Sequence, residues 1–159
     1  TAALGITPTW QGVVEGAIAL VAGTGAGQFD LAYAAERAVA ASGNDDIDLS
    51  GSLTDAFGNT ITAAEIVALM IVNRPKSLAD AVNTTDLTIG GGAANGWLGI
   101  SNDAADTIGP IKPGGAFFIG AGDAAGIGAV VAGTGDILRI SNSSGATCNY
   151  QVAILGRSA

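Results

Sequence analysis

Histidine is absent from this sequence of 159 residues, and cysteine occurs once, as Cys148. Without histidine there is no Ser-His-Asp relay, no imidazole general base and no histidine-containing zinc site. A single cysteine excludes a disulfide within the chain, and its position beside the strand-type sequence NYQVAILG predicts a small buried hydrophobe rather than a reactive thiol. The sequence therefore predicts a protein that is not an enzyme and has no catalytic, cofactor-binding or metal-binding residues.

Charge is also scarce. Charged residues make up 13% of the chain, and six Lys and Arg stand against fourteen Asp and Glu, which gives a formal charge of −8. The cations do not cluster, and the nearest pair, Arg74 and Lys76, is separated by Pro75, so nucleic acid is not an expected partner. A surface with few charges has little to desolvate when two protein faces meet. The same composition also fits a domain that is simply neutral outside, and both interpretations stay open.

Long apolar runs are missing as well. No segment reaches the roughly 18 unbroken apolar residues of a membrane span, and no charged leader precedes an apolar segment, so we expect neither a membrane protein nor a targeted one. The length lies within the usual size range of one domain, which predicts a single domain over residues 1–159.

What the sequence does contain is a series of short apolar or alternating segments bounded by turns rich in glycine, asparagine and proline. Alternation over 29–39 is typical of a half-exposed strand, although its alanines would equally permit a helix. Asp46 to Ser50 alternates cleanly and is short enough for an edge strand. The expected strands lie at residues 10–21, 29–39, 46–50, 66–72, 87–89, 116–119, 137–141 and 149–155.

One helix signal interrupts this pattern. Thr62 and Glu65 have the spacing of a helix capping box, in which each side chain bonds a free backbone amide of the first turn. The apolar residues 66–72 could continue as a buried helix, or one turn of helix could lead into a core strand. We favour the strand because Ile71 and Val72 are β-branched. The predicted fold is all-β, a β-sandwich or jelly roll of about eight short antiparallel strands with one short helix near residues 62–66.

Two groups of aspartates are candidates for metal binding or hydrolysis. Asp45, Asp46 and Asp48 could offer oxygen ligands to calcium, but the segment lacks the glycine and the distal glutamate of a calcium loop. We interpret them as edge-strand charges that deter aggregation. Asp103 and Asp106 could support hydrolysis by paired carboxylates, and we interpret them as loop residues.

Aromatic side chains supply another candidate function, because Trp10, Trp97, Tyr33 and Tyr150 could stack on a sugar ring. Aromatics are only 5% of the chain, so core packing is the favoured interpretation. A carbohydrate-binding spike or tail-associated module is the alternative function.

Two shorter motifs give weaker indications of a function. The glycines of residues 23–27 match part of a dinucleotide fingerprint, but no βαβ unit surrounds them. Asn83 and Asn142 begin glycosylation sequons, which matter only in a secreted eukaryotic chain.

Five stretches, taken in order, carry a family resemblance: DLSGSLTDAFGNTIT (48–62), LTIGGGAANGW (87–97), IKPGGAFFIGAG (111–122), AVVAGTGDILRISN (129–142) and YQVAILGRSA (150–159). Together they resemble a family of small virion structural proteins of tailed bacteriophages. The resemblance implies a β-sandwich or jelly roll that acts as a head decoration, cement or spike component. It implies a homo-oligomer, with a trimer favoured, whose partners are the major capsid protein or other virion proteins. It places the protein on the capsid exterior, after assembly in the host cytoplasm, where a decoration or cement protein would bind and stabilise the outer head lattice.

Overall fold

The structure is a computed structural model that describes residues 19–55, 58–92, 94–143 and 145–159. Every regular element in these residues is a β-strand. The strands are β1 (Val21–Ala22), β2 (Gln28–Phe29), β3 (Leu31–Val39), β4 (Asn44–Asp48), β5 (Ser50–Thr54), β6 (Thr60–Thr62), β7 (Glu65–Val72), β8 (Leu87–Gly90), β9 (Thr107–Ile111), β10 (Ala116–Gly120), β11 (Gly128–Ala129), β12 (Ile137–Asn142) and β13 (Cys148–Arg157).

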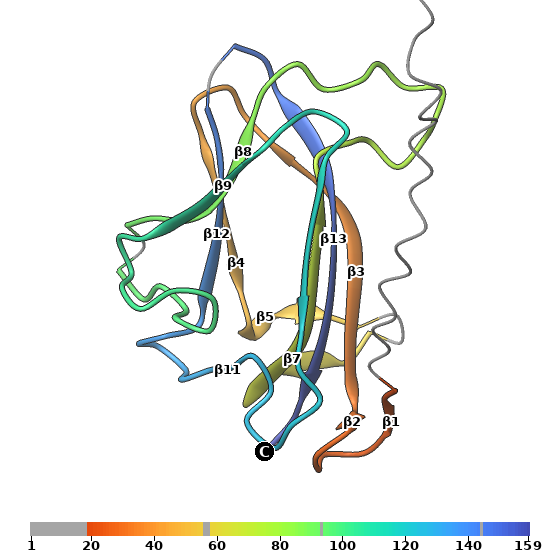
Figure 1. Ribbon diagram of the computed structural model, residues 1–159, viewed down its shortest axis with the longest axis vertical. Helices are drawn as coiled ribbons and strands as arrows, with labels where there is room; N and C mark the ends of the chain where they lie inside the picture. Colours follow the sequence, from red (N-terminus) through yellow and green to blue (C-terminus); the bar gives the residue numbers. More distant parts are fainter. Residues whose placement is uncertain (1–18, 56–57, 93, 144) are drawn as a thin grey trace, which may run out of the picture.

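Two antiparallel sheets form the body of the molecule. The larger sheet has the order β10-β7-β13-β3, with β11 also paired to β7, and the smaller sheet has the order β4-β12-β8-β9. Figure 1 shows them as two layers, with β4, β8 and β12 on one side and β3, β7 and β13 on the other. The buried apolar side chains of both layers form one cluster, so the all-β sandwich predicted from the sequence is confirmed.

Alternation explains why the long strands pack as they do. On β13, Tyr150, Val152 and Ile154 are buried while the residues between them are partly exposed. The neighbouring β3 alternates over its whole length, as predicted, and pairs with β13 from Leu31 to Val39. Since side chains alternate across a strand, one face of each strand enters the core and the other faces away from it.

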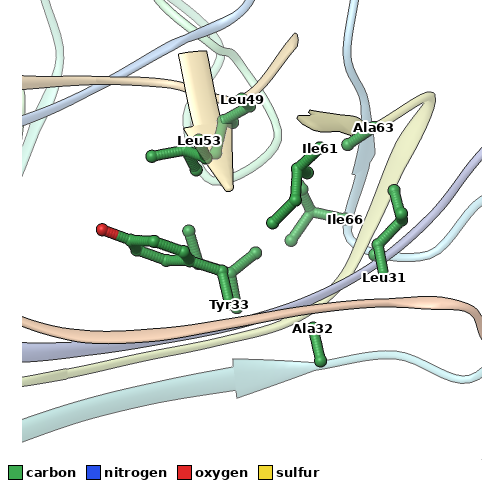
Figure 2. A pocket seen from close by; sticks show the side chains of 10 residues that line it. Leu31, Ala32, Tyr33, Leu49, Leu53, Ile61, Ala63 and Ile66 are labelled. Carbon is green, nitrogen blue, oxygen red and sulfur yellow. The ribbon is translucent and has the colours of Figure 1, made fainter. Parts of the chain in front are cut away.

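The hairpin of β5 and β6 crosses one end of the sandwich (Figure 1). Its Leu53 and Ile61 are buried and meet Leu31 and Tyr33 of β3 around a small apolar hollow, seen in Figure 2. The hollow encloses about 10 Å³, which is about the space of one water-sized sphere. It is a packing gap in the core and is too small for an organic ligand.

Arg157 ties the carboxyl end of β13 to three other segments. Its side chain is only 1% exposed, and Nε lies 2.8 Å from Oε2 of Glu65. Its Nη1 donates to the carbonyl of Gly25 and its Nη2 to the carbonyl of Asp123. A buried guanidinium needs such partners to offset its desolvation, and here they hold the β1-β2 turn and the loop before β11 against the sheet.

The prediction of a short helix near residues 62–66 is wrong. Thr62 ends β6, and β7 begins at Glu65. The amides of Ala63 and Ala64 donate to the carbonyls of Leu49 and Arg157, and the Glu65 carboxylate pairs with Arg157. In a helix that began at Thr62, the amides of Ala63 and Ala64 would lie in the first turn without partners inside the helix, and here long-range carbonyls bind them instead.

The other strand predictions are largely confirmed. The segments at 29–39, 46–50, 66–72, 87–89, 116–119, 137–141 and 149–155 each contain or overlap a strand, and β4 is an edge strand of the smaller sheet. Of the expected strand at 10–21, residues 10–18 lie outside the described residues. The described residues form more than the eight or so strands that were predicted. Short strands such as those of the β1-β2 and β5-β6 pairs were missed because their sequences show no clear alternation of apolar and polar residues. None of the described residues belongs to a helix that could cross a membrane.

Candidate functional site

The two sheets of the sandwich differ in the chemistry of their solvent-facing sides. An antiparallel sheet with one face in water normally alternates apolar residues inward with polar residues outward. The smaller sheet follows this rule. Its outward side chains include Asn44, Asp46, Asp48, Thr88, Arg139 and Ser141.

The larger sheet departs from the rule. We call the solvent-facing side of β10, β7, β13 and β3 the outer face. Apart from the ion pair of Glu65 and Arg157 at one end of β7 and β13, its charged residue is Glu36, and its uncharged polar residues are Asn149 and Gln151. The remaining outward side chains are small or apolar: Ala32, Ala34, Ala38, Ala68, Met70, Val72, Ala116, Phe118, Ala153 and Leu155. An exposed sheet of this composition is typical of a surface that is covered by another layer of protein.

The strand register places one row of four side chains straight across the outer face. Phe118 of β10 lies opposite Met70 of β7, Met70 lies opposite Ala153 of β13, and Ala153 lies opposite Ala34 of β3. The two large side chains are the prominent ones, since Phe118 is 63% exposed and Met70 is 40% exposed. We call Phe118 and Met70 the ridge, and Ala153 and Ala34 the trough.

The trough is hollowed at two places. One hollow of about 210 Å³ lies among Ala34, Glu36, Gln151 and Ala153, with Met70 and Lys76 at its margin. A second, of about 320 Å³, extends along the same alanines toward Ala32, Leu155 and the end of β5. Because the alanines end at Cβ, another layer of side chains could enter here and reach the backbone of the sheet.

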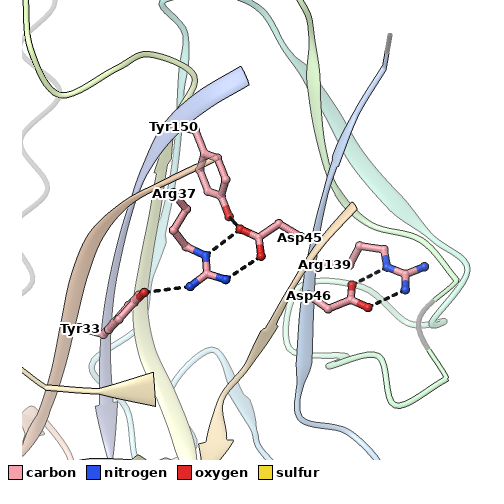
Figure 3. Close-up of polar contacts among 6 residues, drawn as sticks. All are labelled: Tyr33, Arg37, Asp45, Asp46, Arg139 and Tyr150. Atoms are coloured by element: carbon pink, nitrogen blue, oxygen red, sulfur yellow. Dashed lines mark hydrogen bonds and ion pairs between the residues drawn. The ribbon is translucent and has the colours of Figure 1, made fainter. Parts of the chain in front are cut away.

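Between the sheets lies a polar network centred on Asp45 (Figure 3). Arg37 donates to both carboxylate oxygens of Asp45, at 2.6 and 2.7 Å, and the Tyr150 hydroxyl donates at 2.7 Å. Arg37 also donates to the hydroxyl of Tyr33 at 3.1 Å. The network links β4 of the smaller sheet with β3 and β13 of the larger one.

The protonation states follow from these contacts. Burial by itself would raise the pKa of Asp45, but the hydrogen bonds from Arg37 and Tyr150 outweigh it and hold that pKa below its ordinary value. The hydrogen bond to Asp45 raises the pKa of Arg37. Burial, followed by the bond to Asp45, raises the pKa of the Tyr150 hydroxyl. Each group therefore keeps one protonation state near neutral pH, as a fixed structural link does.

The three aspartates considered for calcium do not converge. Asp45 points between the sheets to Arg37, and Asp46 lies on the far side of β4 in a two-point ion pair with Arg139 (Figure 3). The hydrogen bonds from Arg139 lower the pKa of Asp46. Asp48 accepts the backbone amide of Ser50. Alternation along β4 sends Asp45 to the opposite face from Asp46 and Asp48, and Asp46 and Asp48 each bind a different partner, so the three carboxylates offer no common site for an ion.

The other carboxylate pair lies in an exposed loop. Asp103 accepts the amide of Ala105 through its side chain and the amide of Asp106 through its backbone carbonyl. These bonds are typical of an aspartate that shapes a turn. Both carboxylates therefore lie in a loop, as the sequence predicted.

The aromatic candidates are mostly core residues. Trp97 is 5% exposed and its indole N–H donates to the carbonyl of Ala129 at 2.9 Å, while Tyr150 is fully buried. Tyr33 is half-buried beside Arg37, and Trp10 lies outside the described residues. Neither Trp97 nor Tyr150 presents a ring face on which a sugar could stack.

The remaining motifs are also structural. Residues 23–27 form the turn between β1 and β2, where a strand rather than a helix follows the glycines. Cys148 is buried, as predicted, and its Sγ donates to Oδ1 of Asn73 at 3.1 Å. Burial raises the pKa of its thiol. Asn83 and Asn142 are buried and use their side-chain amides in hydrogen bonds to protein groups.

Asn73 is a buried residue that the sequence patterns did not single out. Its side-chain amide donates to the carbonyls of Thr85 and Ile111, and its Oδ1 accepts from Asn83 and Cys148. An asparagine that ends an apolar strand is a signal for such a role, because its polar groups must find partners in the core.

Comparison with known proteins adds no relative, since no protein-family model and no curated protein matches the chain. The outer face is therefore the feature of the described residues that most clearly indicates a function.

Proposed function

We propose that this chain is a virion structural protein of a tailed bacteriophage, of the decoration or cement kind that binds the outside of the head. The observation that carries the proposal is the outer face, a broad apolar side of a rigid sheet in a chain that otherwise carries a formal charge of −8. The resemblance to small virion proteins is the reason for proposing a phage head as the structure to which this face binds. Its partners are the major capsid protein or other virion proteins, including further copies of itself.

The physical argument concerns how such a protein stabilises a lattice. A cement protein acts by binding surfaces on adjacent subunits, so that their separation would expose apolar area to water. The gain is about 25 cal/mol for each Å² of apolar surface removed from water. Few charged side chains on the contact face mean little desolvation to oppose that gain. The Asp45 network supports this role, because it ties the two sheets together and lets the sandwich bear load as one body.

Binding of the labelled chain to purified heads and tails of its source phage tests the proposal. We expect saturable binding to heads that lack the chain, little binding to tails, and a higher temperature of head disruption once the chain is bound. The chain should also be found in purified virions. Its absence from virions, or equal binding to tails and heads, would contradict the proposal.

A further inference from the structure

The ridge and the trough of the outer face are complementary to each other. Across the middle row, two large side chains, Phe118 and Met70, are followed by two small ones, Ala153 and Ala34. The hollows lie over the small half, and Phe118, the more exposed of the two large side chains, lies at the outer end of the large half. A layer that fits this face needs a trough where the face has its ridge, and a ridge where it has its trough.

We propose that the occupant of the outer face is the outer face of a second copy of this chain. In such a pair a two-fold axis lies in the interface, parallel to the strands and between β7 and β13. It places Phe118 of each copy over Ala34 of the other, and Met70 over Ala153 of the other. The contact is isologous, because both copies use the same patch and each ridge fills a trough. The inference rests on the proposed function in that the outer face works by contact with protein. One outer face holds either a second copy or the head, so head binding through this face requires the pair to separate.

The neighbouring rows are compatible with the same axis. One step along the strands, the row reads Ala116, Val72, Gln151 and Glu36. The two-fold places Val72 over Gln151 of the other copy, and Glu36 over Ala116 at the margin of the interface. Each Glu36 therefore stays at the rim, where it keeps its water and does not meet its symmetry mate.

Charge also favours this face over the rest of the surface. Two copies that each carry −8 repel one another, and the repulsion is weakest where the approaching surfaces carry few carboxylates. On the outer face Glu36 is accompanied by Lys76, whose backbone amide donates to the Glu36 carboxylate at 3.2 Å. The smaller sheet instead presents Asp46 and Asp48, so pairing through that side would bring acidic residues together.

Mass in solution tests the pairing directly. The chain has a mass of 15.4 kDa, so the expected dimer has 2 × 15.4 = 30.8 kDa by light scattering, with dissociation on dilution. Met70 is the single methionine of the sequence and supplies an independent probe. Peroxide converts an accessible methionine to its sulfoxide. At a concentration where about nine-tenths of the chain is dimeric, oxidation of Met70 should be about tenfold slower than in the monomer, because only the monomer fraction exposes it.

Two charged variants and their mixture test the register. Phe118→Lys and Ala34→Asp each place a charge in the contact, and each variant alone should be monomeric. Mixed in equal amounts they should form a heterodimer. In it, the ammonium at position 118 of one variant lies over the carboxylate at position 34 of the other, and the second 118–34 contact keeps Phe118 over Ala34. Asn44→Lys, which adds the same charge on the exposed side of the smaller sheet, serves as the control and should stay dimeric.

Three results would overturn the inference. One is a monomer or a trimer of the unaltered chain, and another is a dimer whose mass neither Phe118→Lys nor Ala34→Asp changes. The third is slow oxidation of Met70 in a monomer, which would mean that residues 1–18 of the same chain cover the face. Head binding is measured separately, so a monomer that binds heads contradicts this inference alone, and a dimer that binds no heads contradicts the proposed function alone.

Discussion

The Tyr150 hydroxyl offers a sharp test of what holds the two sheets together. Tyr150 is fully buried, and its hydroxyl donates to Asp45 at 2.7 Å. Tyr150→Phe removes this donor without changing the shape of the ring. A hydrogen bond to a charged group contributes roughly 1.5–3 kcal/mol. Because Arg37 still holds both carboxylate oxygens in the variant, we expect the free energy of unfolding to fall by about 2 kcal/mol at pH 7.

The loss should depend on pH in a defined direction. Asp45 has a folded-state pKa below its unfolded value, so the stability it contributes is fully present above about pH 3.9 and is lost as the pH falls through the folded pKa. The difference between the variant and the unaltered chain should therefore shrink over that acidic range. Urea unfolding at pH 7 and at several values below pH 4, followed by circular dichroism, measures it.

Tyr33→Phe is the matched control for this experiment. It removes the same hydroxyl from a half-buried ring whose oxygen accepts from Arg37 at 3.1 Å and does not contact Asp45. We expect a loss of about 1 kcal/mol or less, because the hydroxyl can bond to water instead. Equal losses in the two variants, or a Tyr150→Phe loss that is unchanged in acid, would refute the reasoning.

Three further substitutions have outcomes that the structure fixes. Arg157→Met should lower the free energy of unfolding by about 3–5 kcal/mol, because it leaves Glu65 and several carbonyls without their buried partner. Asn73→Ala should cost more than about 2 kcal/mol, because buried carbonyls lose their donor. Arg139→Ala should cost only about 0.2–1 kcal/mol, and less in high salt, because its pair with Asp46 lies at the surface. Urea unfolding at pH 7 checks all three, and a reversed order of costs would contradict the burial argument.

The all-β class could be predicted from the sequence because it depends on local patterns. Alternation over β3 and β13 produces one buried and one outward face whatever the partner strands are, and glycine-rich turns separate the segments. The burial of Cys148 could be predicted in the same way, from the strand-type sequence beside it. The absence of histidine excludes imidazole chemistry by composition alone, whatever the fold.

The helix signal at Thr62 and Glu65 shows where local patterns fail. The first turn of a helix leaves its backbone amides without partners inside the helix, so whether this segment forms a helix or a strand depends on which partners the rest of the chain supplies. Here Leu49 and Arg157, both distant in sequence, supply them. Such contacts cannot be inferred from spacing within the segment.

The outer face was likewise decided by tertiary structure. In the sequence, Phe117 and Phe118 are adjacent, and nothing local says which ring faces outward. Alanines at 34 and 153 are compatible with either face of a strand. Only the register of β10, β7, β13 and β3 brings Phe118, Met70, Ala153 and Ala34 into one row. The sequence by itself determined that this chain forms strands and has no imidazole chemistry, whereas strand pairing, which is set by contacts far apart in the chain, determined which apolar residues remain at the surface.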